Sequence, residues 1–296
     1  MSALSLYGPI PFSVQEKILR QAPQLQFIRL CVARGRTVDI EQWRSVTNAL
    51  IDSKREPLRA LHVDFARDDE EMLQLLNNTV SSLDHLETLW LVCHTAAKMN
   101  MFESCFEALP LSLQALRLNF SGGYGRSRAV TMTEAQGTVQ ALAACAHRLK
   151  LRQLSLYGFD IEDEYVEGST AAPFFEAIAA HTHLQVLEIG STKPYGQFTV
   201  TKASACIAFL DMIRQLRRLR KLRCSNFWMR NYAAEDENVP SFYDALSQSR
   251  SLLETDYNIG LSREQFADLK KQFAENDLSL RADQLCDLTI SLVNLD

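Results

Sequence analysis

Aliphatic residues recur along the chain in a six-residue pattern, Leu-x-x-Leu-x-Leu, with mostly polar or small residues between them. Six segments match it, at 25–30, 58–63, 86–91, 113–118, 151–156 and 184–189. Residues 1–6 and 219–224 fit as well, and a degenerate copy around Leu252 and Tyr257 has Thr255 where an aliphatic residue belongs. Alternate side chains of a strand point to the same face. The pattern therefore predicts about nine strands, each with one apolar face.

Between these strands, apolar residues return every three or four positions, which is typical of amphipathic helices. The clearest segments are 40–52, 69–84, 133–147, 201–217 and 262–274, and residues 11–20 fit a first helix. Helix starts are indicated by Asp39, by Thr133 with Gln136, and by Ser262 with Gln265. Each repeat is thus predicted to be strand, loop, helix, loop.

This repeat resembles the leucine-rich repeat family in its long, helix-containing form, as in ribonuclease inhibitor and the repeat domains of F-box proteins. Its spacing exceeds the roughly 20–29 residues usual for such repeats. The resemblance implies an α/β solenoid, a horseshoe with a parallel concave sheet of about nine strands and helices on the convex side. The family's Asn or Cys ladder, which follows each strand, is absent, so we expect irregular curvature.

The whole chain is predicted to form one domain, because each repeat buries its apolar face only against its neighbours. Residues 1–260 form the solenoid, and residues 261–296 form a capping helix to Gln272 followed by a final strand. The first strand position begins at Met1. We expect the helix at 11–20, a further N-terminal domain or a partner to shield that strand edge.

Composition narrows the range of partners and compartments. The 296 residues carry 31 basic and 36 acidic side chains, a net charge of −5, which disfavours binding through many phosphates. No apolar run approaches the roughly 18 residues of a spanning helix, and no signal peptide is visible. The seven cysteines are scattered and form no C-x-x-C pair. We therefore expect reduced thiols and an intracellular, cytoplasmic protein without nucleic-acid or membrane binding.

The fifth side chain of each hexamer, which lies between the last two aliphatic positions, is predicted to face the concave surface. At this position Arg29, His62, Trp90 and Arg117 follow one another, a basic and aromatic row of roughly 15 Å at the usual strand spacing. An exposed tryptophan flanked by arginines is the composition of a binding hot spot. The predicted partner-binding residues are Arg29, His62, Trp90, Arg117, Tyr157, Arg223 and Asp256.

Several features have simpler interpretations. Trp90 could instead pack as core under a long loop. His181 and His183 stand at a helix end, where a capping role is favoured over metal binding, and His62 has no second histidine at ligand spacing. The basic run at 214–223 includes Leu216, Leu219 and Leu222 in structural phase, which disfavours a nucleic-acid site there.

We find no sequence motif for catalysis, phosphate binding or metal binding, so no cofactor is expected. The leading hypothesis is a non-enzymatic protein that binds a protein partner in the concave groove, as a monomer or weak dimer. Its setting could be a ubiquitin-ligase substrate receptor or a bacterial effector in a host cytosol. The alternatives are an unrecognised enzyme with ligase-like thiol chemistry at Cys286 and Asp287, and a self-assembling scaffold.

Overall fold

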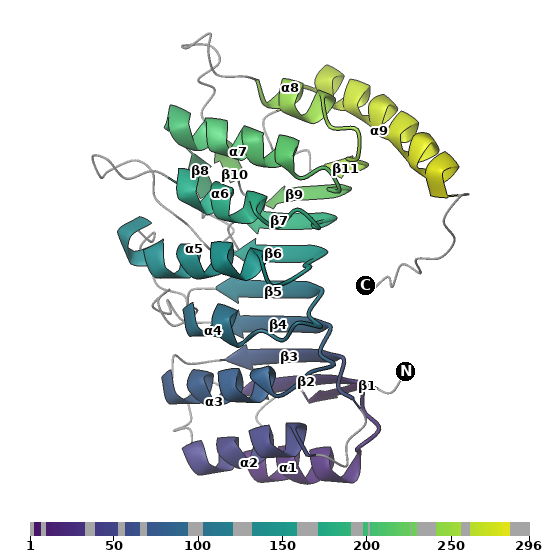
Figure 1. The fold of residues 1–296 in the computed structure, drawn as a ribbon. Helices are drawn as coiled ribbons and strands as arrows, with labels where there is room; N and C mark the ends of the chain where they lie inside the picture. Colours follow the sequence, from purple (N-terminus) through teal and green to yellow (C-terminus); the bar gives the residue numbers. More distant parts are fainter. Residues whose placement is uncertain are drawn as a thin grey trace.

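The chain folds as a stack of strands with helices beside them (Figure 1). The computed structural model describes residues 3–6, 10–32, 39–52, 57–65, 70–93, 103–120, 132–158, 171–190, 198–200, 202–225, 227–229, 241–255 and 261–284. Within them, one parallel sheet of nine strands has the order β1-β2-β3-β4-β5-β6-β7-β9-β11. Its strands are β1 (Ala3–Leu6), β2 (Phe27–Val32), β3 (Ala60–Phe65), β4 (Thr88–Cys93), β5 (Ala115–Phe120), β6 (Gln153–Tyr157), β7 (Val186–Gly190), β9 (Lys221–Ser225) and β11 (Glu254–Thr255).

The hexamers set the register of this sheet. Ile28 pairs with Leu61, Leu61 with Leu89, and the same hexamer position stays in line as far as Leu222 of β9. A shift by one residue would turn every leucine to the opposite face, so the repeated pattern fixes the pairing. The predicted leucine-rich repeat solenoid, with about nine parallel strands, is confirmed.

Most helices line one side of the sheet, the last one lies at the end of the stack beyond β11, and each contacts the next along the chain (Figure 1). They are α1 (Phe12–Gln21), α2 (Ile40–Leu50), α3 (Glu70–Ser81), α4 (Glu103–Ala108), α5 (Met132–Ala146), α6 (Ala172–Ala179), α7 (Ala203–Gln215), α8 (Phe242–Ser247) and α9 (Arg263–Gln284). The Asp39 carboxylate accepts hydrogen bonds from the amides of Glu41 and Gln42, as predicted for a cap. Ser262 and Gln265 form the predicted reciprocal capping box.

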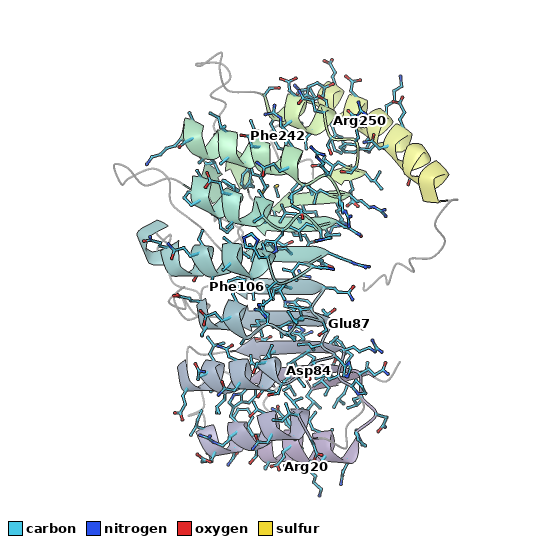
Figure 2. The ribbon with its side chains drawn as sticks, in the orientation of Figure 1. Arg20, Asp84, Glu87, Phe106, Phe242 and Arg250 are labelled. Carbon is cyan, nitrogen blue, oxygen red and sulfur yellow. The ribbon has the colours of Figure 1, made fainter. Side chains whose placement is uncertain are left out.

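The core lies between the two layers. The first, fourth and sixth hexamer positions are buried in every described repeat from β2 to β9, and the helices contribute Trp43, Phe106 and Phe209. Figure 2 shows side chains between the helices and the sheet, with Phe106 of α4 labelled. The Trp43 indole packs against Phe12 and donates a hydrogen bond of 3.2 Å to the Met72 carbonyl, which ties α1, α2 and α3 together.

The later repeats contain extra elements that the sequence pattern did not reveal. Strands β8 (Phe198–Val200) and β10 (Phe227–Met229) pair in parallel as a separate small sheet. The Phe227 ring lies 4.8 Å from that of Phe209, tilted by 30°, and Phe209 also packs against Phe175 and Phe242. Aromatic side chains thus fill the core of these repeats, next to the leucine ribbon.

Two predicted boundaries were wrong. Helix α5 begins at Met132, so Thr133 lies inside the helix instead of capping it. The predicted break after Gln272 does not exist, because α9 continues to Gln284 through a stretch without Gly or Pro. Gln272 and Asn276 donate side-chain hydrogen bonds to the carbonyls of Ser247, Ser249 and Leu252, which hold α9 against the turn before β11. Residues 285–296, with the predicted final strand, lie outside the described residues.

Candidate functional site on the polar face of the sheet

The face of the sheet that points away from the leucine core carries polar and aromatic side chains, and we call it the polar face. Its central row runs across the strands in register: Ser5, Arg29, His62, Trp90, Arg117, Ser155, Glu188 and Arg223. Arg29, His62, Trp90 and Arg117 therefore lie on four successive strands, β2 to β5, in the predicted order. This is the surface that was predicted to be concave.

Four side chains of this face form a continuous stack, which we call the aromatic stack: His62, Trp90, Arg117 and Tyr157. The rings of His62 and Trp90 are 4.0 Å apart and nearly parallel, with an interplanar angle of 9°. The Arg117 guanidinium lies 4.2 Å from the centre of the Trp90 ring and 5.4 Å from that of Tyr157. Such cation–π contacts fix the guanidinium between two rings.

The tryptophan is less exposed than the sequence suggested. Trp90 was predicted to be an exposed side chain between arginines, but it is half-buried and packs between His62 and Arg117. His62 is only 2% exposed. Burial, helped by the positive charges of Arg29 and Arg117, lowers the pKa of His62 to about 3, so the imidazole is neutral near pH 7.

Polar atoms in and beside the aromatic stack lack hydrogen-bond partners. Within the described residues, Nε2 of His62, Nε1 of Trp90, Nε of Arg117 and Oδ1 of Asn119 are buried without one. Buried polar groups are almost always hydrogen-bonded, because each unmade bond costs about 1–3 kcal/mol. The cluster of unpartnered polar atoms on β3, β4 and β5 therefore lowers the stability of this part of the sheet.

The other half of the polar face is arranged differently, around the carboxylate of Glu188, which is 6% exposed. Its Oε2 accepts hydrogen bonds from the hydroxyls of Ser155 (2.8 Å) and Tyr157 (3.2 Å). Its Oε1 lies 3.5 Å from the Arg223 guanidinium, which also reaches Glu254 at 3.3 Å. Lys221 completes this ion-pair cluster at 3.1 Å from Glu254.

Tyr157 joins the two halves. Its ring touches Arg117 and its hydroxyl donates to Glu188. Burial, together with the neighbouring Glu188 carboxylate, raises the pKa of Tyr157 to about 12. The phenol therefore stays protonated at physiological pH and can hold this hydrogen bond.

The predicted site residues thus fall into three groups. His62, Trp90, Arg117 and Tyr157 form the aromatic stack, and Arg29 lies next to it on β2 with its guanidinium 3.9 Å from Asp64. Arg223 belongs to the ion-pair cluster. Asp256 lies outside the described residues.

Ser155 and Glu188 occupy the same hexamer position as Arg117, and Lys221 and Glu254 lie in the row beside it, but the sequence analysis did not select them as site residues. The available signal was the alternation of charge between neighbouring strands at these positions, with Glu188 beside Arg223 and Lys221 beside Glu254. Opposite charges on adjacent strands attract each other across the sheet.

Four described cysteines and His181, which were the other candidates for a chemical role, are buried in the core or between helices. Cys105, Cys145, Cys206 and Cys224 are buried thiols outside any disulfide, and burial raises the pKa of Cys105 and Cys145 to about 12. His181 is buried, with Nε2 3.0 Å from the Leu142 carbonyl of α5, so it links two helices instead of capping its own. Cys286 and Asp287 lie outside the described residues.

The described residues contain neither a candidate metal site nor a candidate membrane-spanning helix. No group of three or more His, Cys, Asp or Glu side chains there could hold a metal ion. None of the helices in that part is long and apolar enough to span a membrane. In the basic run, Leu216, Leu219 and Leu222 are buried as predicted, and Arg214 pairs with Asp211.

Comparison with known proteins gave structural likeness only. No protein-family model matches the chain, and no curated protein matches it. The leucine-rich repeat-containing protein LegL7 from Legionella pneumophila is similar in structure, with 11% identity, a TM-score of 0.44, and coverage of 93% of this chain and 91% of LegL7. A protein from Bacteroides fragilis is similar with 10% identity, a TM-score of 0.42, and coverage of 84% and 70%.

Proposed function

We propose that this chain is a non-enzymatic recognition protein that binds a protein partner on the polar face of its sheet. The observation that carries this proposal is the aromatic stack, which holds Trp90, Arg117 and Tyr157 in fixed positions on β4, β5 and β6. Tryptophan, tyrosine and arginine are the residues most enriched in binding hot spots. Side chains that are already ordered lose little conformational entropy when a partner binds.

The test is Trp90→Ala, which removes the centre of the stack. We expect the affinity for a partner captured from lysate to fall by about 2 kcal/mol or more, roughly thirtyfold in Kd. Leu111→Ala is the matched control, because Leu111 is a highly exposed apolar side chain in the turn between α4 and β5. Both variants should keep the circular dichroism spectrum of the wild type. A folded Trp90→Ala variant with unchanged affinity would contradict the proposal.

We further propose an intracellular, cytoplasmic setting, because four described cysteines are thiols outside any disulfide, which fits a reducing compartment. A ubiquitin-ligase substrate receptor and a bacterial effector acting in a host cytosol are the two settings to separate. Mass spectrometry of the captured complex separates them, since enrichment of ligase adaptor subunits supports the first. The same sample, by its mass in solution, tests the proposed monomer or weak dimer.

A further inference from the structure

Arg117 differs from the other described arginines of the polar face in its lack of a counter-charge. Arg29 lies near Asp64, and Arg223 contacts Glu188 and Glu254. Within the described residues, the guanidinium of Arg117 makes no hydrogen bond or ion pair, and its contacts are the rings of Trp90 and Tyr157. A half-buried positive charge is thus held in place without being neutralised.

The described residues around Arg117 do not neutralise its positive charge. His62 is neutral near pH 7, Ser155 on the next strand and Asn119 further along β5 carry no charge, and Glu188 is already shared between Arg223 and two hydroxyls. The next cations of the central row, Arg29 on one side and Arg223 on the other, each lie three strands away, and each lies near a carboxylate. Among the described residues, the half of the polar face over β3 to β5 therefore presents one positive charge without a counter-charge.

The geometry of the guanidinium favours one chemical class of ligand. The guanidinium carbon lies close to two ring centres, those of Trp90 and Tyr157, so a ligand must reach the nitrogens where these rings leave them open. Of its three nitrogens, Nε alone is buried without a partner, which leaves the two terminal nitrogens to donate. Two parallel N–H groups in a plane match the two oxygens of a carboxylate.

We propose that Arg117 is the anchor for a carboxylate, supplied by an acidic side chain of the protein partner. This inference rests on the proposed function, because the partner delivers the carboxylate to the polar face. Trp90 and Tyr157 act as positioning residues that hold the guanidinium edge outward. A phosphate group fits this place less well, since recognition of its nearly two negative charges usually takes a cluster of arginines.

The first experiment needs no partner, because acetate serves as the carboxylate probe. Nitrogen-15 NMR of the full chain follows the Arg117 Nε–H and the Trp90 Nε1–H while acetate is added at constant ionic strength. We expect both signals to shift and saturate in the millimolar range. Arg117→Gln should abolish the saturable shift of Trp90, and Arg117→Lys, which keeps the charge and loses the fork, should weaken acetate binding several-fold.

Arg223→Gln is the matched control, because it removes an arginine of the same row that is already ion-paired. It should leave the acetate titration unchanged. An identical Trp90 shift in Arg117→Gln, or no saturation in the wild type, would overturn the proposal. Inorganic phosphate should bind no more tightly than acetate, and binding tenfold tighter would overturn the choice of a carboxylate.

The failure of this inference can be told apart from failure of the proposed function. If Trp90→Ala loses the captured partner while Arg117→Gln keeps wild-type affinity, the polar face binds a protein and the carboxylate anchor is wrong. If acetate titrates Arg117 but Trp90→Ala keeps the partner, the anion site stands and the proposed binding face is wrong. With both correct, Arg117→Gln should weaken the partner at least tenfold, and the loss should shrink at high salt.

Discussion

The two halves of the polar face use the same strand positions in opposite ways. Over β3 to β5 the central row is a stack of rings and a guanidinium in which several polar atoms have no partner within the described residues. Over β7 to β11, Glu188 and Arg223 of the central row and Lys221 and Glu254 of the row beside it form the ion-pair cluster, in which each charge faces an opposite one. One sheet can thus carry, side by side, a polar network whose groups are all paired and another with unpaired polar atoms.

We interpret this difference as a division of roles, in which one half of the polar face supports folding stability and the other supports binding. A buried network in which all groups are bonded strengthens the native state, whereas each unbonded buried group weakens it. Binding sites commonly carry such a stability cost, because the groups that await a ligand are not satisfied within the chain. We therefore expect substitutions in the ion-pair cluster to affect mainly folding and those in the aromatic stack to affect mainly binding.

The largest effect on stability is expected for Glu188→Ala. This change leaves the buried hydroxyl of Ser155 without its acceptor, releases Tyr157 and removes one partner of Arg223. The free energy of unfolding, measured with urea at pH 7, should fall by about 2–3 kcal/mol. Arg117→Gln is the comparison in the other half and should change it by about 1 kcal/mol or less. Equal losses in the two variants would mean that the halves do not differ in this way.

Much of this contrast depends on a register that the sequence could predict. The hexamers fix both the strand phase and the neighbours in the row, so the adjacency of Arg29, His62, Trp90 and Arg117 followed from spacing alone. Leucine periodicity is strong evidence because a one-residue slip would expose the whole apolar set. The helices at 40–50 and 70–81 followed in the same way from their periodicity.

What the sequence could not predict depends on side-chain conformation within that register. Trp90 could have faced solvent or packed on its neighbours, and only the parallel ring of His62 and the Arg117 guanidinium decide that it is half-buried. Glu188 is one acidic residue in a row, and its three partners come from β6 and β9. The short helices α4, α6 and α8 have too few turns to show a clear period.

A smaller effect is expected from pH, through the buried imidazole of the aromatic stack. The pKa of His62 is lowered from 6.5 to about 3, so below pH 6.5 the unfolded chain binds a proton there that the folded chain does not. Stability is therefore fully present above pH 6.5 and falls as the pH drops toward 3. From pH 6.5 to 5 the loss attributable to His62 is about 1.6 kcal/mol.

Urea unfolding of the wild type and of His62→Gln at pH 6.5 and pH 5 measures the loss of unfolding free energy that is due to His62. His181, whose pKa is lowered to about 4 by burial, adds a loss of the same sign in both proteins. The variant should thus keep part of the pH dependence and lose the part due to His62. If the two proteins show the same dependence, folding does not lower the pKa of His62, and at pH 5 the stack carries a second positive charge.

The smallest effect is expected for Glu254→Gln at the outer end of the ion-pair cluster. The Glu254 side chain is 52% exposed, and its contacts with Lys221 and Arg223 are solvent-accessible. Exposed ion pairs contribute about 0.2–1 kcal/mol and weaken with salt, so unfolding in 0.5 M NaCl should scarcely distinguish the variant from the wild type. Because Glu188 still neutralises Arg223, Glu254→Gln should not create a second acetate site. A new saturable acetate shift at Arg223 in this variant would mean that the two halves differ only in degree, since a single exposed carboxylate would then be enough to convert one into the other.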